Sequence, residues 1–199
     1  LYNIYLFKLN QGYNQQYSRN TLQLNRHNGF FSEIGTFSGV HASDWSWSTF
    51  FADMDNDGMK DIFISTGIPR RMNDIDYIDY IVDDVIQNNI RNKNFDEADL
   101  DMLKKLPEIK IENKFFINSG DLTFSDGKEK IKNDLPGFSN GAAFADLDND
   151  GDIEIITNNI NQPASIYKNN SVESGKKPLL EVTLDGLHSN KSGRGTKLI

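Results

Sequence analysis

Short apolar runs separated by turn residues dominate the chain. These runs are rich in Ile, Leu, Phe and Trp, and clusters of Gly, Asn and Asp lie between them. The runs are Leu22–Leu24, Trp47–Ala52, Ile62–Ile64, Lys114–Ile117, Gly141–Ala145 and Ile153–Ile156. Apolar stretches of this length between Gly, Asn and Asp are typical of β-strands joined by tight turns. The pattern therefore predicts an all-β fold.

The runs belong to an internal repeat. A shift of 93 residues aligns two stretches without a gap, so that Phe51-Ala52-Asp53 coincides with Phe144-Ala145-Asp146. A partial third copy occurs at Ile166–Asn170, which lies 51 residues after the matching Phe115–Asn118. The underlying period of about 50 residues is in the range of propeller blades and other β arrays. The longer interval indicates an insertion in the first copy.

This insertion, at about residues 70–110, has a helical pattern. Apolar residues recur at helical spacing in Asn73–Asn89, where Asn73 or Asp74 can cap the start, and a second short helix is expected at Asp96–Lys105. Residues 72–106 contain nine acidic side chains against four basic ones. We interpret the segment as an acidic α-helical insertion, which is either a solvated excursion from one blade or an element that docks a partner.

Two acidic loops occupy equivalent positions of the repeat. Each has Asp at positions one, three and five, Gly at position six and another acid at position nine. Ca²⁺ takes about six to eight oxygens, and this spacing turns carboxylates inward around a Gly turn, with a backbone carbonyl from position seven. The predicted ligands are Asp53, Asp55, Asp57, Met59 and Asp61 in the first loop, and Asp146, Asp148, Asp150, Asp152 and Glu154 in the second. Because these carboxylates repel one another without a cation, we predict two structural Ca²⁺ sites.

Other interpretations of the loops match the sequence less well. An EF-hand needs a bidentate acid at position twelve and helices on both sides, but Ile64 and Thr157 stand there and the flanks are strand-like. The absence of Cys and of a His pair disfavours Zn²⁺. Mg²⁺, which keeps several waters, and an acidic turn without metal remain as alternatives.

Composition narrows the function classes. The chain has 199 residues, a formal charge of −8 and no Cys. An acidic surface repels phosphate backbones, so nucleic acid is not an expected partner, and no apolar run is long enough to form a transmembrane segment. The three His residues have no recognisable triad partners, and carboxylates at loop spacing suit metal ligation better than glycosidase chemistry. We therefore expect no enzymatic activity.

Two further pairs of residues leave alternatives open. Trp45 and Trp47 share a face if they lie on a strand, where they either pack between blades or form a stacking platform for sugars. Arg70 and Arg71 follow Pro69, and they either meet an anion or lie in a solvated turn.

The stretch Phe-Ala-Asp-x-Asp-Asn-Asp-Gly, present in both copies, resembles FG-GAP/VCBS repeats, the blades of integrin-α-like β-propellers. Asn25–Phe31, Asn118–Phe124 and Lys168–Asn170 resemble the Asn-Gly-Asp-Gly-x-Phe element of that family. Trp45-Ser46-Trp47 and Gly67–Arg71, followed by the helical insertion, resemble CRTAC-like proteins of the ASPIC/UnbV class. Leu180–Lys197 resembles the opening of an ASPIC/UnbV domain.

The resemblance implies a β-propeller fragment over residues 1–177, with about three blades of a seven-bladed ring, and the truncated start of an ASPIC/UnbV-like β domain over residues 178–199. It implies Ca²⁺ at the acids of both loops and an extracellular or outer-membrane-associated location on the bacterial cell surface. We read the chain, which starts at Leu1 without Met or signal peptide, as a fragment.

The expected function is a calcium-stabilised, non-enzymatic cell-surface or secreted module that binds protein or glycan, with an outer-membrane complex as one candidate partner. The alternative is an accessory or catalytic part of a polysaccharide-degrading enzyme on a propeller scaffold.

Overall fold

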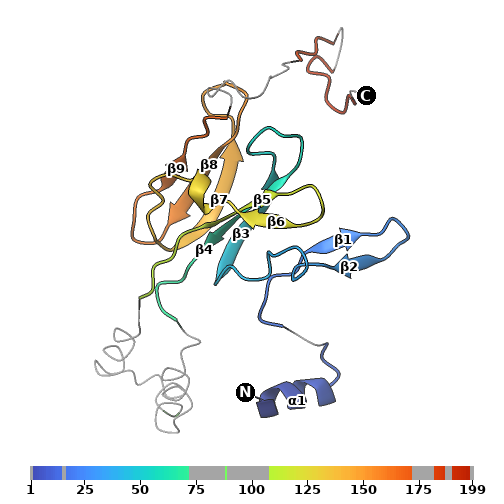
Figure 1. Ribbon diagram of the computed structural model, residues 1–199, viewed down its shortest axis with the longest axis vertical. Coiled ribbons are helices and arrows are strands. Elements are labelled where there is room, and N and C mark those ends of the chain that lie inside the picture. The colour runs from blue at the N-terminus through green and yellow to red at the C-terminus, as the bar shows by residue number, and fades with distance from the viewer. Residues whose placement is uncertain are drawn as a thin grey trace.

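A computed structural model describes residues 2–14, 17–71, 88, 108–171, 182–186 and 190–197. Apart from the N-terminal helix α1 (Tyr2–Asn10), a short 3₁₀ helix, η1 (Lys128–Lys130), and the helical residue Asn88, the regular structure in these residues consists of antiparallel sheets (Figure 1). The strands are β1 (Gln23–Asn25), β2 (Phe31–Glu33), β3 (Ser46–Ala52), β4 (Asp61–Thr66), β5 (Lys114–Asn118), β6 (Phe124–Asp126), β7 (Ser139–Ala145), β8 (Glu154–Asn159) and β9 (Ser165–Tyr167). The prediction of an all-β fold is confirmed.

The strands form three meanders, in which each strand pairs with the next one along the chain. Strands β1 and β2 make a two-stranded sheet, β3 to β6 a four-stranded sheet, and β7 to β9 a three-stranded sheet. Strands β2, β3 and β4 recur 93 residues later as β6, β7 and β8 with the same first and last positions, and β5 recurs 51 residues later as β9. The sequence repeat is therefore a repeat of structure.

A hydrophobic core joins the four-stranded and three-stranded sheets. Phe63, on β4, is fully buried in it, together with Phe115 and Ile155. The Phe50 ring lies 5.2 Å from the ring of Phe63 and 4.8 Å from the ring of Phe144 on β7, measured between centroids. Burial of one such phenyl group contributes about 2–3 kcal/mol, so this aromatic contact between sheets is a main source of stability.

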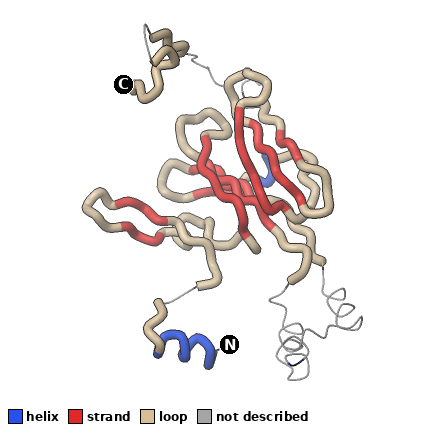
Figure 2. The backbone as a smooth tube through the Cα atoms, turned by 180° about the vertical axis from the view of Figure 1, so that it is seen from behind, coloured by secondary structure: helices blue, strands red, loops and turns tan. Residues whose placement is uncertain are grey.

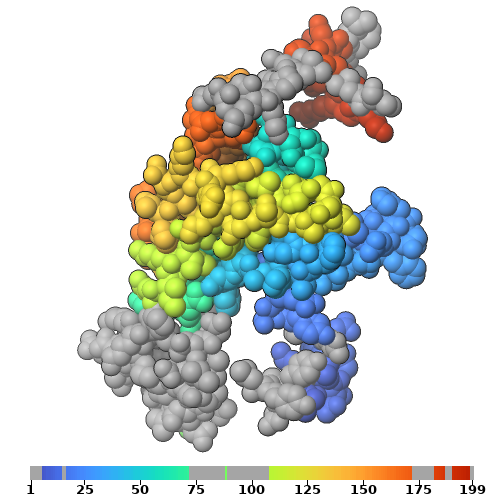
Figure 3. All heavy atoms as spheres, viewed as in Figure 1, coloured from blue at the N-terminus to red at the C-terminus, as the bar shows by residue number. Residues whose placement is uncertain are grey.

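The opposite face of the four-stranded sheet carries a second, smaller core. Ile62, Ile64 and Phe116 are buried there against Val40, which lies in the segment after β2. That segment is anchored because the Ser38 hydroxyl donates to the Leu122 carbonyl at 2.6 Å. The β1–β2 hairpin itself projects from the body formed by the two larger sheets (Figures 2 and 3).

A buried polar network fastens the two larger sheets at one end of the strands. The Asn113 side chain accepts from the Thr66 N–H and donates to the Ser139 hydroxyl at 3.0 Å and to the Tyr167 hydroxyl at 2.9 Å. Tyr167 in turn donates to Asp134 at 2.8 Å. Burial raises the pKa of Tyr167 to about 12. The network thus holds a neutral phenol between the sheets.

The structure bears on the other sequence expectations to different extents. The helical insertion lies outside the described residues, apart from Asn88 and the residues at its two ends. The helix α1 was not predicted, because its apolar residues are distributed almost all round rather than along one stripe. The side chains of Trp45 and Trp47 are exposed and belong to neither core, although the Trp47 indole N–H donates to the Gly67 carbonyl at 2.8 Å. Among the described residues, no helix is long and apolar enough to cross a bilayer.

We predict that Tyr167 makes stability fall at alkaline pH. The pKa is raised from 10.0 to about 12 in the folded protein, so its contribution is complete below about pH 10 and is lost as pH rises toward 12. Urea unfolding at pH 9, 10 and 11 should show the wild type losing more stability than Tyr167→Phe. Equal losses in the two proteins would contradict the assignment.

Candidate metal centre

The first acidic loop is the turn between β3 and β4. Pairing of the two strands ends at Ala52 and Asp61, and the chain reverses through left-handed conformations at Asn56 (φ 53°) and Gly58 (φ 85°). Glycine adopts such a conformation without the steric cost that other residues meet, and Asn is among the residues that tolerate it. The N–H groups of Asp57 and Gly58 donate to the two Asp53 oxygens at 2.9 and 2.8 Å. Asp53 therefore organises the turn.

The second loop, between β7 and β8, has the same construction. Asn149 (φ 60°) and Gly151 (φ 89°) repeat the two left-handed positions. The Gly151 N–H donates to Asp146 at 3.1 Å, and the Asp152 N–H donates to Asp150 at 3.1 Å. The repeated sequence therefore produces a repeated backbone in both loops.

The carboxylates of each loop converge. Asp53, Asp55 and Asp57 each place an oxygen within 4.8 Å of the others. In the second loop Glu154 belongs to two such groups, one with Asp146 and Asp148 and the other with Asp150 and Asp152.

These groups fit a hard divalent cation. All of the side-chain donors are oxygens, which are the ligands that Ca²⁺ and Mg²⁺ take. One of them, Oδ2 of Asp150, is buried and has no hydrogen-bond partner. Leaving a buried carboxylate oxygen unsatisfied is costly, and a bound cation would satisfy it. The acidic clusters can therefore hold a metal ion.

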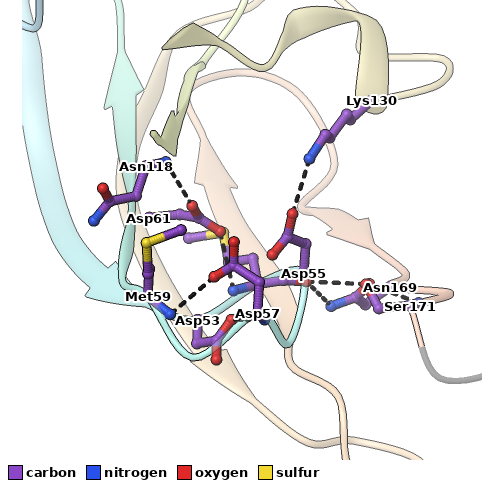
Figure 4. A network of polar contacts seen from close by, with 10 residues as sticks. Asp53, Asp55, Asp57, Met59, Asp61, Asn118, Lys130, Asn169 and Ser171 are labelled. Atoms are coloured by element: carbon purple, nitrogen blue, oxygen red, sulfur yellow. Dashed lines mark hydrogen bonds and ion pairs between the residues drawn. The ribbon is translucent and has the colours of Figure 1, made fainter. Parts of the chain in front are cut away.

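The acid at position nine has a structural task that the sequence analysis missed. Asp61 is only 1% exposed and accepts the N–H groups of Met54 at 3.2 Å and Asn118 at 2.9 Å (Figure 4). Glu154 repeats these contacts with Leu147 at 2.9 Å and Asn169 at 3.3 Å. Each acid therefore joins its loop to the neighbouring strand. Asp61 lies outside the first three-carboxylate group, whereas Glu154 takes part in both groups of its loop.

The environment of Asp61 is electrostatically unfavourable for a charge. Burial raises the pKa of its carboxyl above the usual range, and the negative charges of Asp55 and Asp57 act in the same direction. The two backbone N–H donors lower the pKa and offset part of this effect. A cation among the carboxylates would remove the repulsion.

One lysine pairs with the position-three acid of each loop. The Lys130 ammonium lies 2.9 Å from Asp55, and the Lys168 ammonium lies 3.1 Å from Asp148. Lys130 comes from η1 and Lys168 follows β9, so the two lysines do not occupy equivalent positions of the repeat. Ion pairs as exposed as these contribute little stability, but they offset part of the loop charge.

The arginines after Pro69 are also paired. Arg71 lies 2.7 Å from Asp44, and Arg70 lies 2.9 Å from Glu108. These contacts support the interpretation of a partly solvated turn stabilised by carboxylates.

We predict that Asp61→Ala destabilises the protein even without calcium. The substitution leaves the N–H groups of Met54 and Asn118 without their acceptor, which costs about 2–4 kcal/mol in total. Asp57→Ala is the matched control, because it removes an exposed acid of the same loop and should change the unfolding free energy by less than about 1 kcal/mol. Denaturant unfolding in EGTA measures both variants. Similar losses for the two would show that Asp61 has no special structural role.

Comparison with known families adds to this geometry. Residues 8–64 match the FG-GAP-like repeat, over a segment that runs from within α1 to β4 and includes the whole first acidic loop. The CRTAC-like and ASPIC/UnbV features have no counterpart in this match and stay predictions. A comparison with curated proteins finds no match. The first copy of the structural repeat is thus similar to the FG-GAP-like repeat.

Proposed function

We propose that the protein is a calcium-stabilised, non-enzymatic β-propeller module that acts outside the cell and binds a protein or glycan partner. The observation that carries the proposal is the pair of equivalent acidic hairpin turns with converging carboxylates, the first of which lies inside the segment similar to the FG-GAP-like repeat. Repeats of this kind are typical of extracellular proteins, where calcium is abundant enough to fill weak sites.

The way in which the sheets pack supports a propeller. The three-stranded sheet meets the four-stranded sheet through Phe144, Ile155 and Tyr167. The residues equivalent to Ile155 and Tyr167 in the four-stranded sheet are Ile62 and Phe116, and these lie in the second core, on the opposite face. Each sheet therefore packs onto the preceding one through the same face, as consecutive blades do.

The first and last of the three sheets also support a propeller. Strands β1 and β2 are equivalent to β5 and β6, the last two strands of a four-stranded unit. Phe51, the equivalent of Phe144, is 45% exposed and lines a groove of about 420 Å³ beside β1. Ile166, the equivalent of the buried Phe115, is 65% exposed on the outer face of the three-stranded sheet. These apolar positions match surfaces that neighbouring blades would cover.

Calcium would act structurally in this module. The carboxylates turn toward their own loop, and Ca²⁺ would neutralise them at the turn of each hairpin. The acids at position nine are committed to backbone N–H groups, which suits an architectural role better than acid–base chemistry. The binding surface for the partner would then lie on blade faces and loops that these hairpins hold in place.

We predict that calcium raises the melting temperature. A ligand at about 100 times its Kd stabilises the folded state by about 2.7 kcal/mol per site, which corresponds to a rise of about 5–10 °C for a chain of this size. Differential scanning calorimetry in CaCl₂, in MgCl₂ and in EGTA measures the effect. Calcium should stabilise more than magnesium, and identical curves in CaCl₂ and EGTA would reject structural calcium.

We predict that each loop supplies part of the calcium response. The variants Asp55→Asn with Asp57→Asn, and Asp148→Asn with Asp150→Asn, should each lose about one equivalent of bound Ca²⁺ in titration calorimetry. Asp121→Asn removes an acid from a turn outside both loops and should bind as the wild type does. Unchanged stoichiometry in the paired variants would place the calcium elsewhere.

A further inference from the structure

The first acidic loop is bonded directly to the three-stranded sheet. Its second residue, Met54, offers its carbonyl oxygen to two donors from the turn after β9. The Asn169 side-chain amide donates to it at 2.7 Å and the Ser171 hydroxyl at 3.1 Å. Asn169 also donates to the Ile153 carbonyl of its own sheet at 3.3 Å. One side chain therefore spans the two sheets at the edge of the candidate metal centre.

The side chain of Met54 strengthens this junction. It is 5% exposed and packs in the core between the sheets with Phe63 and Ile155. Its N–H is held by Asp61, which also accepts the Asn118 N–H. A single residue of the loop thus contacts the acid at position nine, the neighbouring sheet's turn and the shared core.

The second loop differs at the equivalent position. Leu147 stands where Met54 stands in the first loop, and it is 47% exposed. In the described part of the chain, Leu147 packs in neither core, whereas Met54 is buried between the sheets. The two loops therefore have the same backbone but different surroundings.

We propose that the first acidic loop is a joint between sheets, in which calcium binding and docking of the three-stranded sheet stabilise each other. The inference rests on the proposed calcium sites. Calcium would fix the backbone from Asp53 to Asp61, and this fixes the Met54 carbonyl that Asn169 and Ser171 bind. By linkage, a docked sheet must raise calcium affinity by the same factor by which calcium favours docking.

Hydrogen exchange tests the coupling in a variant whose only intact acidic loop is the first. Asp148→Asn with Asp150→Asn supplies this background. Addition of CaCl₂ should slow amide exchange not only in β3 and β4 but also in β8 and β9, on the other sheet, by at least about threefold. Slowing confined to β3 and β4 would overturn the proposal.

Calorimetric titration in the same background tests the reciprocal effect. Ser171→Ala removes one donor to Met54 and should weaken calcium binding at the first loop by about three- to fivefold. Ser119→Ala is the matched control, because Ser119 is an exposed serine in the turn after β5, the counterpart of the turn that holds Ser171. It should bind calcium with the affinity of the background. Equal affinities for the two variants would also overturn the proposal.

The two proposals fail in different ways. If neither loop of the wild type takes up calcium, the proposed function is wrong and the coupling is wrong with it. If calcium binds to the first loop without slowing exchange in β8 and β9 or responding to Ser171→Ala, the calcium-stabilised module stands and only the joint is rejected.

Discussion

The repulsion among carboxylates at the hairpin turns is the constraint around which this structure is organised. The first loop, Asp53–Asp61, contains four acids, three of which converge, and the second loop, Asp146–Glu154, contains five. Three features reduce this repulsion. Backbone N–H groups donate to the acids, one lysine pairs with each loop, and the geometry fits a cation. Asp61 and Glu154 also join these turns to the next strand through backbone N–H groups. A change in the charge of either acid would therefore also affect how its sheet is held together.

The repeat carries this arrangement from one sheet to the next. Equivalent strands have equivalent bounds, and equivalent turns have equivalent left-handed residues. Each of the two larger sheets has a backward face, toward the preceding part of the chain, and a forward face, toward the part that follows. Aromatic residues dominate the forward face of the four-stranded sheet, where Phe50, Phe63 and Phe115 meet the next sheet. The polar network around Asn113 fastens the opposite strand ends, so the contact between sheets is closed at both ends.

The sequence predicted both loops and the strands β1, β3, β4, β5, β7 and β8, because similar apolar runs recur at one fixed interval. The three-residue strands β2, β6 and β9 were not among the predicted runs, because they are too short to give an apolar run of their own. The sequence could not predict the structural role of Asp61, since Asn118 is 57 residues away and the insertion hides their proximity. The ion pairs of the two loops with lysine could not be predicted either, because Lys130 and Lys168 occupy unrelated positions of the repeat. Tertiary contacts between non-equivalent positions leave no periodic signal, and neither does an isolated helix such as α1.

The exposed outer face of the three-stranded sheet has a consequence for assembly. That face, which carries Ile166, is equivalent to the face of the four-stranded sheet that packs against the three-stranded sheet. The groove beside Phe51 is equivalent to the face of the three-stranded sheet that takes part in the same contact. The two surfaces are thus complementary to each other rather than each to itself. Contacts of this head-to-tail kind close into a ring when the rotation between units allows it and otherwise extend into open filaments. The rotation between consecutive sheets therefore decides whether two such surfaces can meet each other or only pack against further sheets.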